Sequence, residues 1–273
     1  MSSGFEWATA ATSESWVGLE ISGDEFGTRS RFVDIGHRFR DGSQLTVFGG
    51  NSVYSYLMPD SSTGYIKHPL QEVVVSTDDR RFFSTSLRLG SGGSLQDMQR
   101  HTVGGGLSWS GHNWQFSWRP SLNGYRVDSV IQLISVVNFY GYSSRLGYRY
   151  FSESGWRAGI QWENSRYSVN LKALAIYPRL QFLFSPTGNM SLVDLTSSTT
   201  SLSLGRAGRV LALDVMLFSA RSVVTGGRIM GSQVNLQWFI SSHWTMTLGI
   251  TRQVDEQTGF GTSSGLTALE YNW

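Results

Sequence analysis

Apolar and polar side chains alternate at every second position along most of this chain, and this period of two restricts its fold more than any other feature. In the segment YSSRLGYRYF, Tyr142 and Tyr148 fall on one face of an extended strand, and Arg145 and Arg149 fall on the other. A soluble β-sandwich would bury the aromatic face in its core. A transmembrane β-barrel would turn the aromatic face to lipid and the arginine face to a wet interior.

The same alternation recurs from one end of the chain to the other, which predicts an all-β protein. Large apolar residues on one face oppose Gly, Ser, Thr, Asn, Gln or charged residues on the other. Several strands place Trp or Tyr at the ends of the apolar face, as the aromatic girdles of a membrane barrel require. LQFLFSP and LTSSTTSLSLG are weaker candidate strands. The clearest segments are SWVGLEIS, RFVDIGHRF, RFFSTSLRL, TVGGGLSW, WQFSWRP, GWRAGIQWE, QVNLQWFI and SSGLTALEYNW.

The composition favours the membrane barrel over a soluble sheet protein. Only 15% of the residues are charged, against a usual quarter, while 13% are aromatic. A mean hydropathy of -0.17 is too polar for a helical membrane protein, and the longest apolar run, VIQLISVV, is far shorter than the roughly 18 residues that a membrane helix needs. The absence of cysteine excludes disulfides and thiolate metal sites, and the net charge of +2 does not indicate a nucleic-acid partner.

Short and long connections alternate between the predicted strands. RDGS, SGHN and SESG suit tight hairpins, whereas YLMPDSSTGYIKHP and GSGGSLQDMQ are longer, with NSR as a brief exception. Bacterial outer-membrane barrels combine short periplasmic turns with long outer loops. The spacing predicts a transmembrane antiparallel up-and-down β-barrel of about 16 strands over residues 15–273, after a periplasmic N-terminal stub at 1–14.

The last residues of the chain carry a family resemblance. Leu269, Tyr271 and the terminal Trp273 alternate on one face, and this pattern resembles the signal that the assembly machinery of bacterial outer-membrane barrels recognises. The resemblance implies a bacterial outer-membrane location, with lipids and that machinery as partners. The opening MSSGFEWATAATSESW has no basic start followed by an apolar stretch, so we expect a mature or truncated product opened by an added Met.

Size, strand number and an N-terminus that begins abruptly in the periplasm together resemble the barrel modules of exopolysaccharide export porins of the cellulose, poly-N-acetylglucosamine and Pel types. That resemblance rests on architecture and carries over no residue. It implies a translocation pore for a polysaccharide chain, preceded in such porins by a periplasmic helical-repeat domain.

Charged residues on the polar faces are the candidates for lining the pore. Rings of charge set selectivity in channels, although the same charges could pair across neighbouring strands and only stiffen the wall. Because arginine outnumbers acid in this set, we expect a lumen that favours anionic or neutral solutes. The candidates are Glu20, Asp34, Arg38, Arg88, Arg119, Arg145, Arg149, Arg157, Glu163, Lys172 and Asp214, with Arg126 on a polar face or just beyond it.

No catalytic, cofactor or metal site is predicted. The five histidines are scattered, although His68, His101 or Asp97 could contribute to a catalytic pair at the outer rim. No cluster has metal-ligand spacing, and GSGGS lacks the strand-to-helix context of a phosphate loop. The alternatives to an export pore are a general small-solute diffusion porin, an outer-membrane hydrolase, and a structural barrel plugged by its loops.

Overall fold

The computed structural model is all-β and consists of antiparallel strands. It describes residues 14–25, 27, 29–40, 43–57, 63–79, 83–93, 98–127, 137–170, 196–223, 226–257, 259 and 261–273. The fourteen strands are β1 (Glu14–Asp24), β2 (Arg29–Arg38), β3 (Gln44–Leu57), β4 (Thr63–Asp79), β5 (Phe83–Gly93), β6 (Met98–Ser110), β7 (Trp114–Val127), β8 (Val137–Phe151), β9 (Trp156–Tyr167), β10 (Thr196–Ala207), β11 (Leu211–Ser222), β12 (Arg228–Phe239), β13 (Trp244–Asp255) and β14 (Gly261–Asn272).

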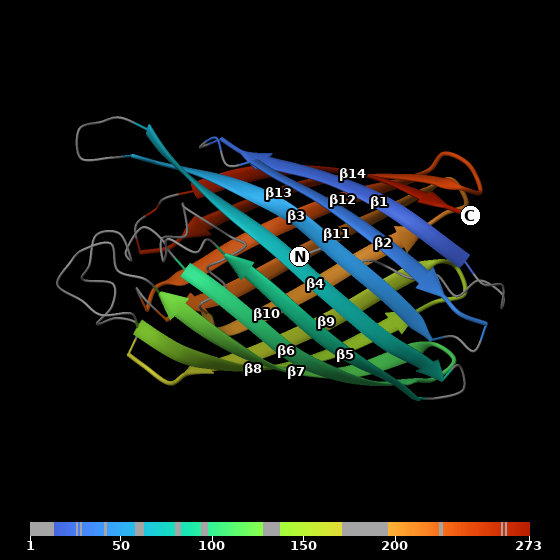
Figure 1. Ribbon diagram of the computed structural model, residues 1–273. Helices are drawn as coiled ribbons and strands as arrows, with labels where there is room; N and C mark the ends of the chain where they lie inside the picture. Colours follow the sequence, from blue (N-terminus) through green and yellow to red (C-terminus); the bar gives the residue numbers. More distant parts are fainter. Residues whose placement is uncertain are drawn as a thin grey trace.

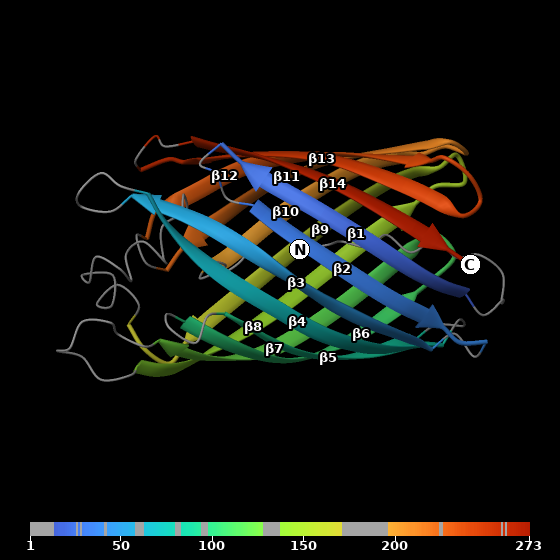
Figure 2. The same cartoon turned by 45° about the horizontal axis from the view of Figure 1, so that its top comes forward.

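The sheet closes on itself as a barrel (Figures 1 and 2). Every strand pairs antiparallel with its neighbours in sequence, and β1 pairs with β14, where Leu19 lies opposite Leu269. The predicted up-and-down barrel is therefore confirmed, with fourteen strands closing it rather than about sixteen. The weak candidate LQFLFSP lies outside the described residues. Within the described ranges, no helix is long and apolar enough to cross a membrane.

Several predicted connections are wrong because the strands run further than the apolar pattern. β9 continues through Asn164–Arg166, which the sequence suggested as a brief loop. β3 extends to Leu57 and β4 begins at Thr63, so most of YLMPDSSTGYIKHP is paired backbone. Gly90–Gly93 of the GSGGS segment belong to β5. Backbone pairing does not require apolar side chains, so a strand can extend beyond the segment in which apolar and polar residues alternate.

The first described residue, Glu14, and the last residue, Trp273, lie at one end of the barrel, which we call the turn end. There, Ser15 and Trp273 exchange two backbone hydrogen bonds, each 2.9 Å long. Tight connections join the strands at this end; the one from β8 to β9 has Gly155 at a φ of 83°. At the opposite end, called the loop end, β7 and β9 finish and β8 and β10 begin (Figure 2).

The outer surface of the barrel is apolar. Side chains of alternate parity point outward, and among the described residues only Phe32, Tyr125, Phe139, Ala212 and Ala220 form a buried hydrophobic set. A water-soluble protein would not expose a continuous belt of this kind, so the barrel spans a membrane. The belt includes Leu19, Ile21, Val33, Ile35, Val47, Leu87, Leu89, Val103, Ile160, Leu202, Leu204, Leu213, Leu217, Val234, Leu248 and Ile250.

Aromatic side chains gather on the outside near the turn end, where the apolar belt stops. Trp and Tyr favour the membrane–water interface because their rings are apolar and their tips are polar. The predicted aromatic girdle is thus present at this end. Its exposed members include Trp109, Trp114, Tyr150, Trp156, Trp238 and Trp244.

Candidate functional site: the inner wall of the barrel

The inner wall carries the side chains whose parity is opposite to that of the apolar belt. It is not a dry core, because Arg88 and Arg119 are exposed there. Lys172 lies outside the described residues, and Arg126 shares the outward parity of Leu122, so its predicted place on a polar face is wrong. The predicted pore-lining residues with inward parity are Glu20, Asp34, Arg38, Arg88, Arg119, Arg145, Arg149, Arg157, Glu163 and Asp214.

Three acidic side chains form one sector of the wall, on β14, β1 and β2. Asp34 and Glu270 are the register partners of Gly18 on either side, and Glu20 follows on the same face. Asp34 repels both Glu20 and Glu270 electrostatically. Trp16 Nε1 donates a hydrogen bond of 2.9 Å to Asp34 Oδ2. We call Glu20, Asp34 and Glu270 the acidic wall.

The Asp34 carboxylate lies flat over the backbone of Gly18. A Cβ atom at this glycine would lie only 2.9 Å from Asp34 Cγ, which is closer than real Cβ contacts. A larger residue at position 18 would therefore push the carboxylate away from Trp16. Gly18 therefore determines the position of the Asp34 carboxylate on the wall.

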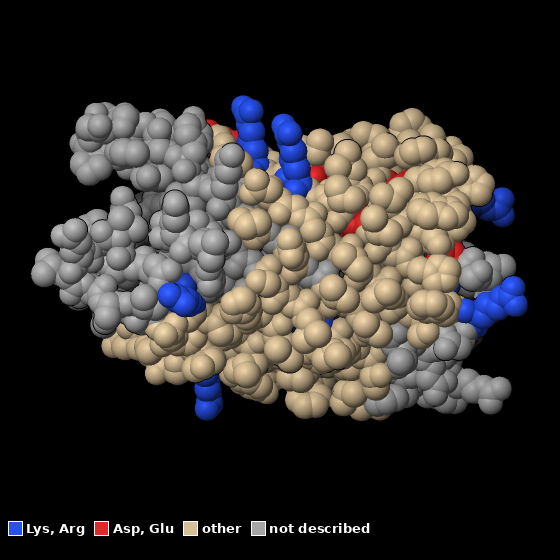
Figure 3. All heavy atoms as spheres, viewed as in Figure 1, with Lys and Arg blue, Asp and Glu red and all other residues tan. Residues whose placement is uncertain are grey.

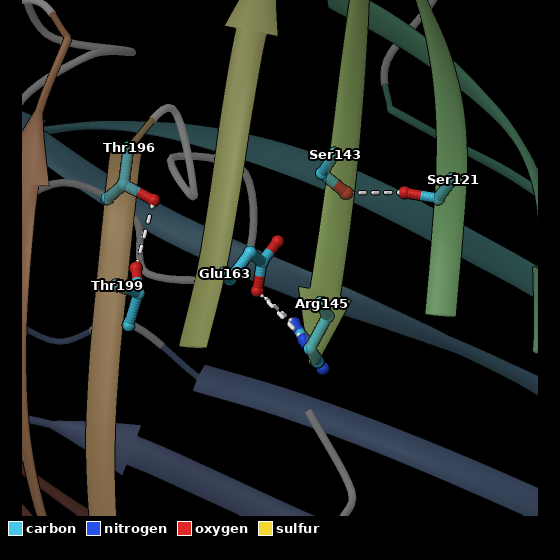
Figure 4. A network of polar contacts seen from close by, with 6 residues as sticks. All are labelled: Ser121, Ser143, Arg145, Glu163, Thr196 and Thr199. Carbon is cyan, nitrogen blue, oxygen red and sulfur yellow. Dashed lines mark hydrogen bonds and ion pairs between the residues drawn. The ribbon is translucent and has the colours of Figure 1, made fainter. Parts of the chain in front are cut away.

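An arginine-rich sector lies on β5, β7, β8 and β9. Arg119, Arg145 and Glu163 are register partners on three adjacent strands. Arg145 donates from Nε and Nη2 to Glu163 Oε2, at 2.8 and 2.6 Å (Figure 4). The structure thus pairs two of the predicted lining charges across neighbouring strands, which is the alternative to a selective lining. We call Arg88, Arg119, Arg145 and Arg149 the arginine wall.

The Arg145–Glu163 pair lies among hydroxyl groups. Ser121 Oγ and Ser143 Oγ, on β7 and β8, are 2.6 Å apart, and Thr196 and Thr199 on β10 share a hydrogen bond of 3.2 Å (Figure 4). These groups can exchange hydrogen bonds with water or with a polar solute.

The most buried ion pair of the inner wall joins Arg157 of β9 to Asp214 of β11. Both guanidinium Nε and Nη2 donate to the carboxylate, Nε at 2.6 Å to Oδ1. The side chains are 10% and 13% exposed. The pair spans the intervening β10 at Gly205, the register partner of both residues. A Cβ atom at Gly205 would lie 2.8 Å from Arg157 Nε, so this contact requires glycine.

The acidic and arginine walls face each other across the barrel. β1, at the centre of the acidic wall, and β8, in the arginine wall, are separated by seven steps in the ring of fourteen strands in either direction. Asp34 and Glu270 lie close to the turn-end limits of their strands, as does Arg149. A solute crossing this part of the barrel would therefore meet a transverse electric field.

The expected excess of arginine over acid is not found on the described inner wall. The sequence-based set omitted the acids Glu14 and Glu270, which also face inward. Two arginines are neutralised by carboxylates, Arg145 by Glu163 and Arg157 by Asp214, and Arg38 lies 4.0 Å from Glu14. The premise for anion preference was wrong because it treated segregated and paired charges as one uniform lining.

A third sector, on β12 and β13, is polar but uncharged over its central part. Its amides and hydroxyls point inward, and Gln233 Nε2 donates to Asn235 Oδ1 at 3.1 Å. Such groups can hydrogen-bond neutral solutes without attracting ions. The sector comprises Gln233, Asn235, Gln237, Thr245, Thr247 and Thr251.

Inward-facing aromatic residues on β7 and β8, and on β2 and β3, are packed rather than free. Tyr125 and Phe139 stack with ring centroids 4.6 Å apart, and they are 6% and 1% exposed. Phe32 and Phe48 stack at 4.8 Å on β2 and β3. The stacked faces of Tyr125 and Phe139 are therefore not available to a passing solute.

The described histidines do not assemble into a catalytic group. His37 Nδ1 lies 2.8 Å from Ser15 Oγ at the turn end, and His112 lies 3.8 Å from Glu153 in exposed turns. His101 is exposed on β6, while the side chain of His68 and Asp97 lie outside the described part. No group of three or more His, Cys, Asp or Glu side chains in the described ranges is placed to hold a metal ion.

The C-terminal residues of the predicted assembly signal lie where the barrel closes. The ring centroids of Tyr271 and Trp273 are 5.8 Å apart, and Tyr271 also contacts Trp244 at 4.7 Å. Leu269 is exposed in the apolar belt. Their place at the strand seam is compatible with a recognition role, which stays a prediction.

Replacing Tyr271 and Trp273 together with alanine is expected to slow insertion of the unfolded chain by the purified assembly machinery in liposomes by about tenfold. Spontaneous insertion into thin bilayers without the machinery is expected to change little, since both rings lie at the membrane margin. The matched control is Tyr148→Ala with Tyr150→Ala, two exposed aromatics on β8. Equal slowing with and without the machinery would contradict a recognition role.

No protein-family model matches the sequence, and no curated protein matches it. Among solved structures, the fold is similar to the KdgM porin, determined in complex with disordered oligogalacturonate, at 9% identity over 94% of this chain and 98% of that chain, with a TM-score of 0.45. It is also similar to OccK10 (OpdN) of Pseudomonas aeruginosa, at 7% identity over 96% and 98%, with a TM-score of 0.46. A loop L8 deletion mutant of OmpT, an outer membrane protein of Vibrio cholerae, matches at 8% identity over 96% and 98%, with a TM-score of 0.49. Similarity of fold at these identities does not identify a solute.

Proposed function

We propose that this chain is a channel of the bacterial outer membrane that passes small polar solutes by diffusion. One observation carries the proposal: a closed barrel of fourteen strands has an apolar outside and a polar, charge-divided inside. Eight strands leave room only for packed side chains or one small ligand, and the interior widens with strand number. Inward-facing arginines would be strongly destabilising in a barrel of this size unless water solvated them.

The arrangement of charge supports a channel that orients its solute. A molecule with separated positive and negative groups would align between the acidic and arginine walls. A simple anion or cation would be attracted by one wall and repelled by the other. The uncharged sector on β12 and β13 would hydrogen-bond neutral solutes. The proposed preference is thus for neutral or dipolar solutes, whereas the sequence led us to expect anionic or neutral ones.

Export of a polysaccharide is the second candidate function. The amides and hydroxyls of the uncharged sector favour it, since they match the hydroxyl groups of a sugar chain. Exposed aromatic platforms would favour it further, but the Tyr125–Phe139 stack is buried. We therefore place small-solute diffusion first.

The direct test is to reconstitute the purified chain in a planar lipid bilayer under a salt gradient and record single-channel currents. Steady openings with a reversal potential near zero are expected, because the two walls oppose each other. Liposome swelling in neutral sugars of increasing size then separates diffusion of small solutes from passage of a polymer. Silence from a protein shown by circular dichroism to be folded would contradict an open channel and favour a plugged barrel. Release of lipid or peptide products in the same samples would reveal a hydrolase.

A further inference from the structure

The outer surface near the loop end carries a group of arginines that the channel proposal does not use. Each has the same parity as the exposed apolar residues of its strand, and each side chain is exposed. They occupy β11, β12, β13 and β2, which belong to one continuous arc of the ring through β14 and β1. We call this group the arginine arc: Arg29, Arg31, Arg221, Arg228 and Arg252.

The arc lies just beyond the apolar belt. Arg29 and Arg228 are the first residues of β2 and β12, and Arg221 is the last residue but one of β11. Lys and Arg side chains stand clear of the surface toward the loop end in Figure 3. The corresponding zone at the turn end is occupied mainly by Trp and Tyr, where Arg206 lies over the ring of Trp156 at 5.4 Å. Along this arc the loop-end margin is therefore arginine-rich, whereas the exposed tyrosines of the loop end, Tyr140 and Tyr142, lie on β8.

The arc carries more positive charge than the acidic residues beside it can neutralise: the exposed acids Glu25 and Glu256 lie at its margin, and the backbone N–H of Glu256 donates to the Arg228 carbonyl oxygen at 2.9 Å. Among the described residues of β11–β14, β1 and β2, no outward position holds Asp or Glu, and no ion pair joins the arc to another described residue. The nearby Glu25 accepts a hydrogen bond from the backbone N–H of Ser263, the register partner of Arg252. Positive charge on this surface is therefore left for a ligand outside the chain.

Two arginines of the arc are directly opposed. Arg221 and Arg228 are register partners on β11 and β12, and like charges at opposed positions are destabilising. Arg228 Nε donates to Ser219 Oγ at 2.8 Å, which orients this guanidinium but does not neutralise it. An anion shared by both guanidinium groups would convert the repulsion into attraction.

We propose that the arginine arc binds the phosphate groups of anionic lipids whose acyl chains pack on the apolar belt. A guanidinium fork matches phosphate oxygens in a bidentate geometry, and cations at a membrane interface gain about 1 kcal/mol each from anionic lipid. The inference goes beyond the channel function and does not depend on it. It also assigns the loop end to the leaflet that is richer in phosphorylated lipid.

The test uses the full chain in detergent micelles, titrated with a phosphatidic acid and with the phosphatidylcholine of the same acyl chains, with bound lipids counted by native mass spectrometry. Tighter binding of phosphatidic acid is expected. Arg221→Gln with Arg228→Gln should weaken phosphatidic acid binding by about 30-fold, and Arg29→Gln with Arg31→Gln should act similarly. The matched control, Arg206→Gln with Arg209→Gln at the turn end, should change it less than twofold.

Two further results decide the source of the phosphate and the state of the protein. Inorganic phosphate alone should not displace the lipid, since it lacks acyl chains; displacement would overturn the assignment to lipid. Equal losses in the arc and control variants would overturn the proposal as well, because they would indicate nonspecific charge attraction. Unchanged circular dichroism and unchanged phosphatidylcholine binding show that each variant still forms the barrel.

Discussion

Replacing Asp214 with alanine is expected to lower the free energy of unfolding by about 3 kcal/mol. The substitution leaves the Arg157 guanidinium buried without its carboxylate, and an uncompensated buried charge costs far more than the pair contributes. Urea titration of the barrel in lipid vesicles, followed by tryptophan fluorescence, measures the loss. The control is Glu14→Gln, which removes the longer and more exposed ion pair with Arg38. It should lower the free energy of unfolding by less than about 1 kcal/mol.

The double substitution Arg157→Met with Asp214→Leu distinguishes the effect of the charges on stability from the effect of side-chain packing. Removing both charges is expected to restore most of the stability and leave a loss of about 1 kcal/mol or less. Gly205→Val should destabilise by displacing the same pair, and its effect should be less than additive with Asp214→Ala because both changes remove one interaction. Fully additive losses would show that Gly205 acts independently of the ion pair.

Neutralising the two charged walls is expected to shift the reversal potential in opposite directions. Glu20→Gln with Asp34→Asn and Glu270→Gln should favour anions, and Arg88→Gln with Arg119→Gln and Arg149→Gln should favour cations. Three unit charges about 10 Å from a permeating ion contribute about 1 kcal/mol in water, or about a fivefold change in the permeability of each ion, with opposite signs for cation and anion. The measurement is the bilayer reversal potential in a potassium chloride gradient.

The size of this effect should depend on salt, because exposed charges are screened beyond about 10 Å at 0.1 M. Both shifts should therefore shrink as the mean salt concentration rises. The two variants control for each other, since a general distortion of the barrel would not change selectivity with opposite signs. Shifts in the same direction, or none, would show that the ions do not pass between these walls.

The sequence predicted the barrel well because the alternation that defines a strand is local. Each face of β7 to β9 could be assigned from neighbouring residues, so the inward parity of Arg119, Arg145 and Arg157 followed directly. The ends of the strands were harder to predict from the sequence. Asn164–Arg166 of β9 contain no apolar residue, yet their backbone still pairs with β8. A pattern of side chains cannot show where backbone hydrogen bonding stops.

The ion pairs could not be predicted from residues that are close together in the sequence. Arg157 and Asp214 meet across β10, and only the full register brings them to either side of Gly205. A detectable signal existed for Glu270, because its parity is opposite to that of Leu269 and Tyr271 and therefore places it on the polar face. The opposition of the two walls requires the strand number, since β8 lies opposite β1 only in a ring of fourteen.

The glycines of the inner wall affect more than local packing. Asp34 lies over Gly18, Trp16 over Gly36 and the Arg157 side chain beside Gly205. These three large side chains therefore lie along the wall instead of projecting across it, so at these positions the backbone limits the width of the passage more than the side chains do. Mutational drift in lining residues can then retune the charge of the passage while its width is preserved. Loss of one such glycine would narrow the passage without altering any charged residue.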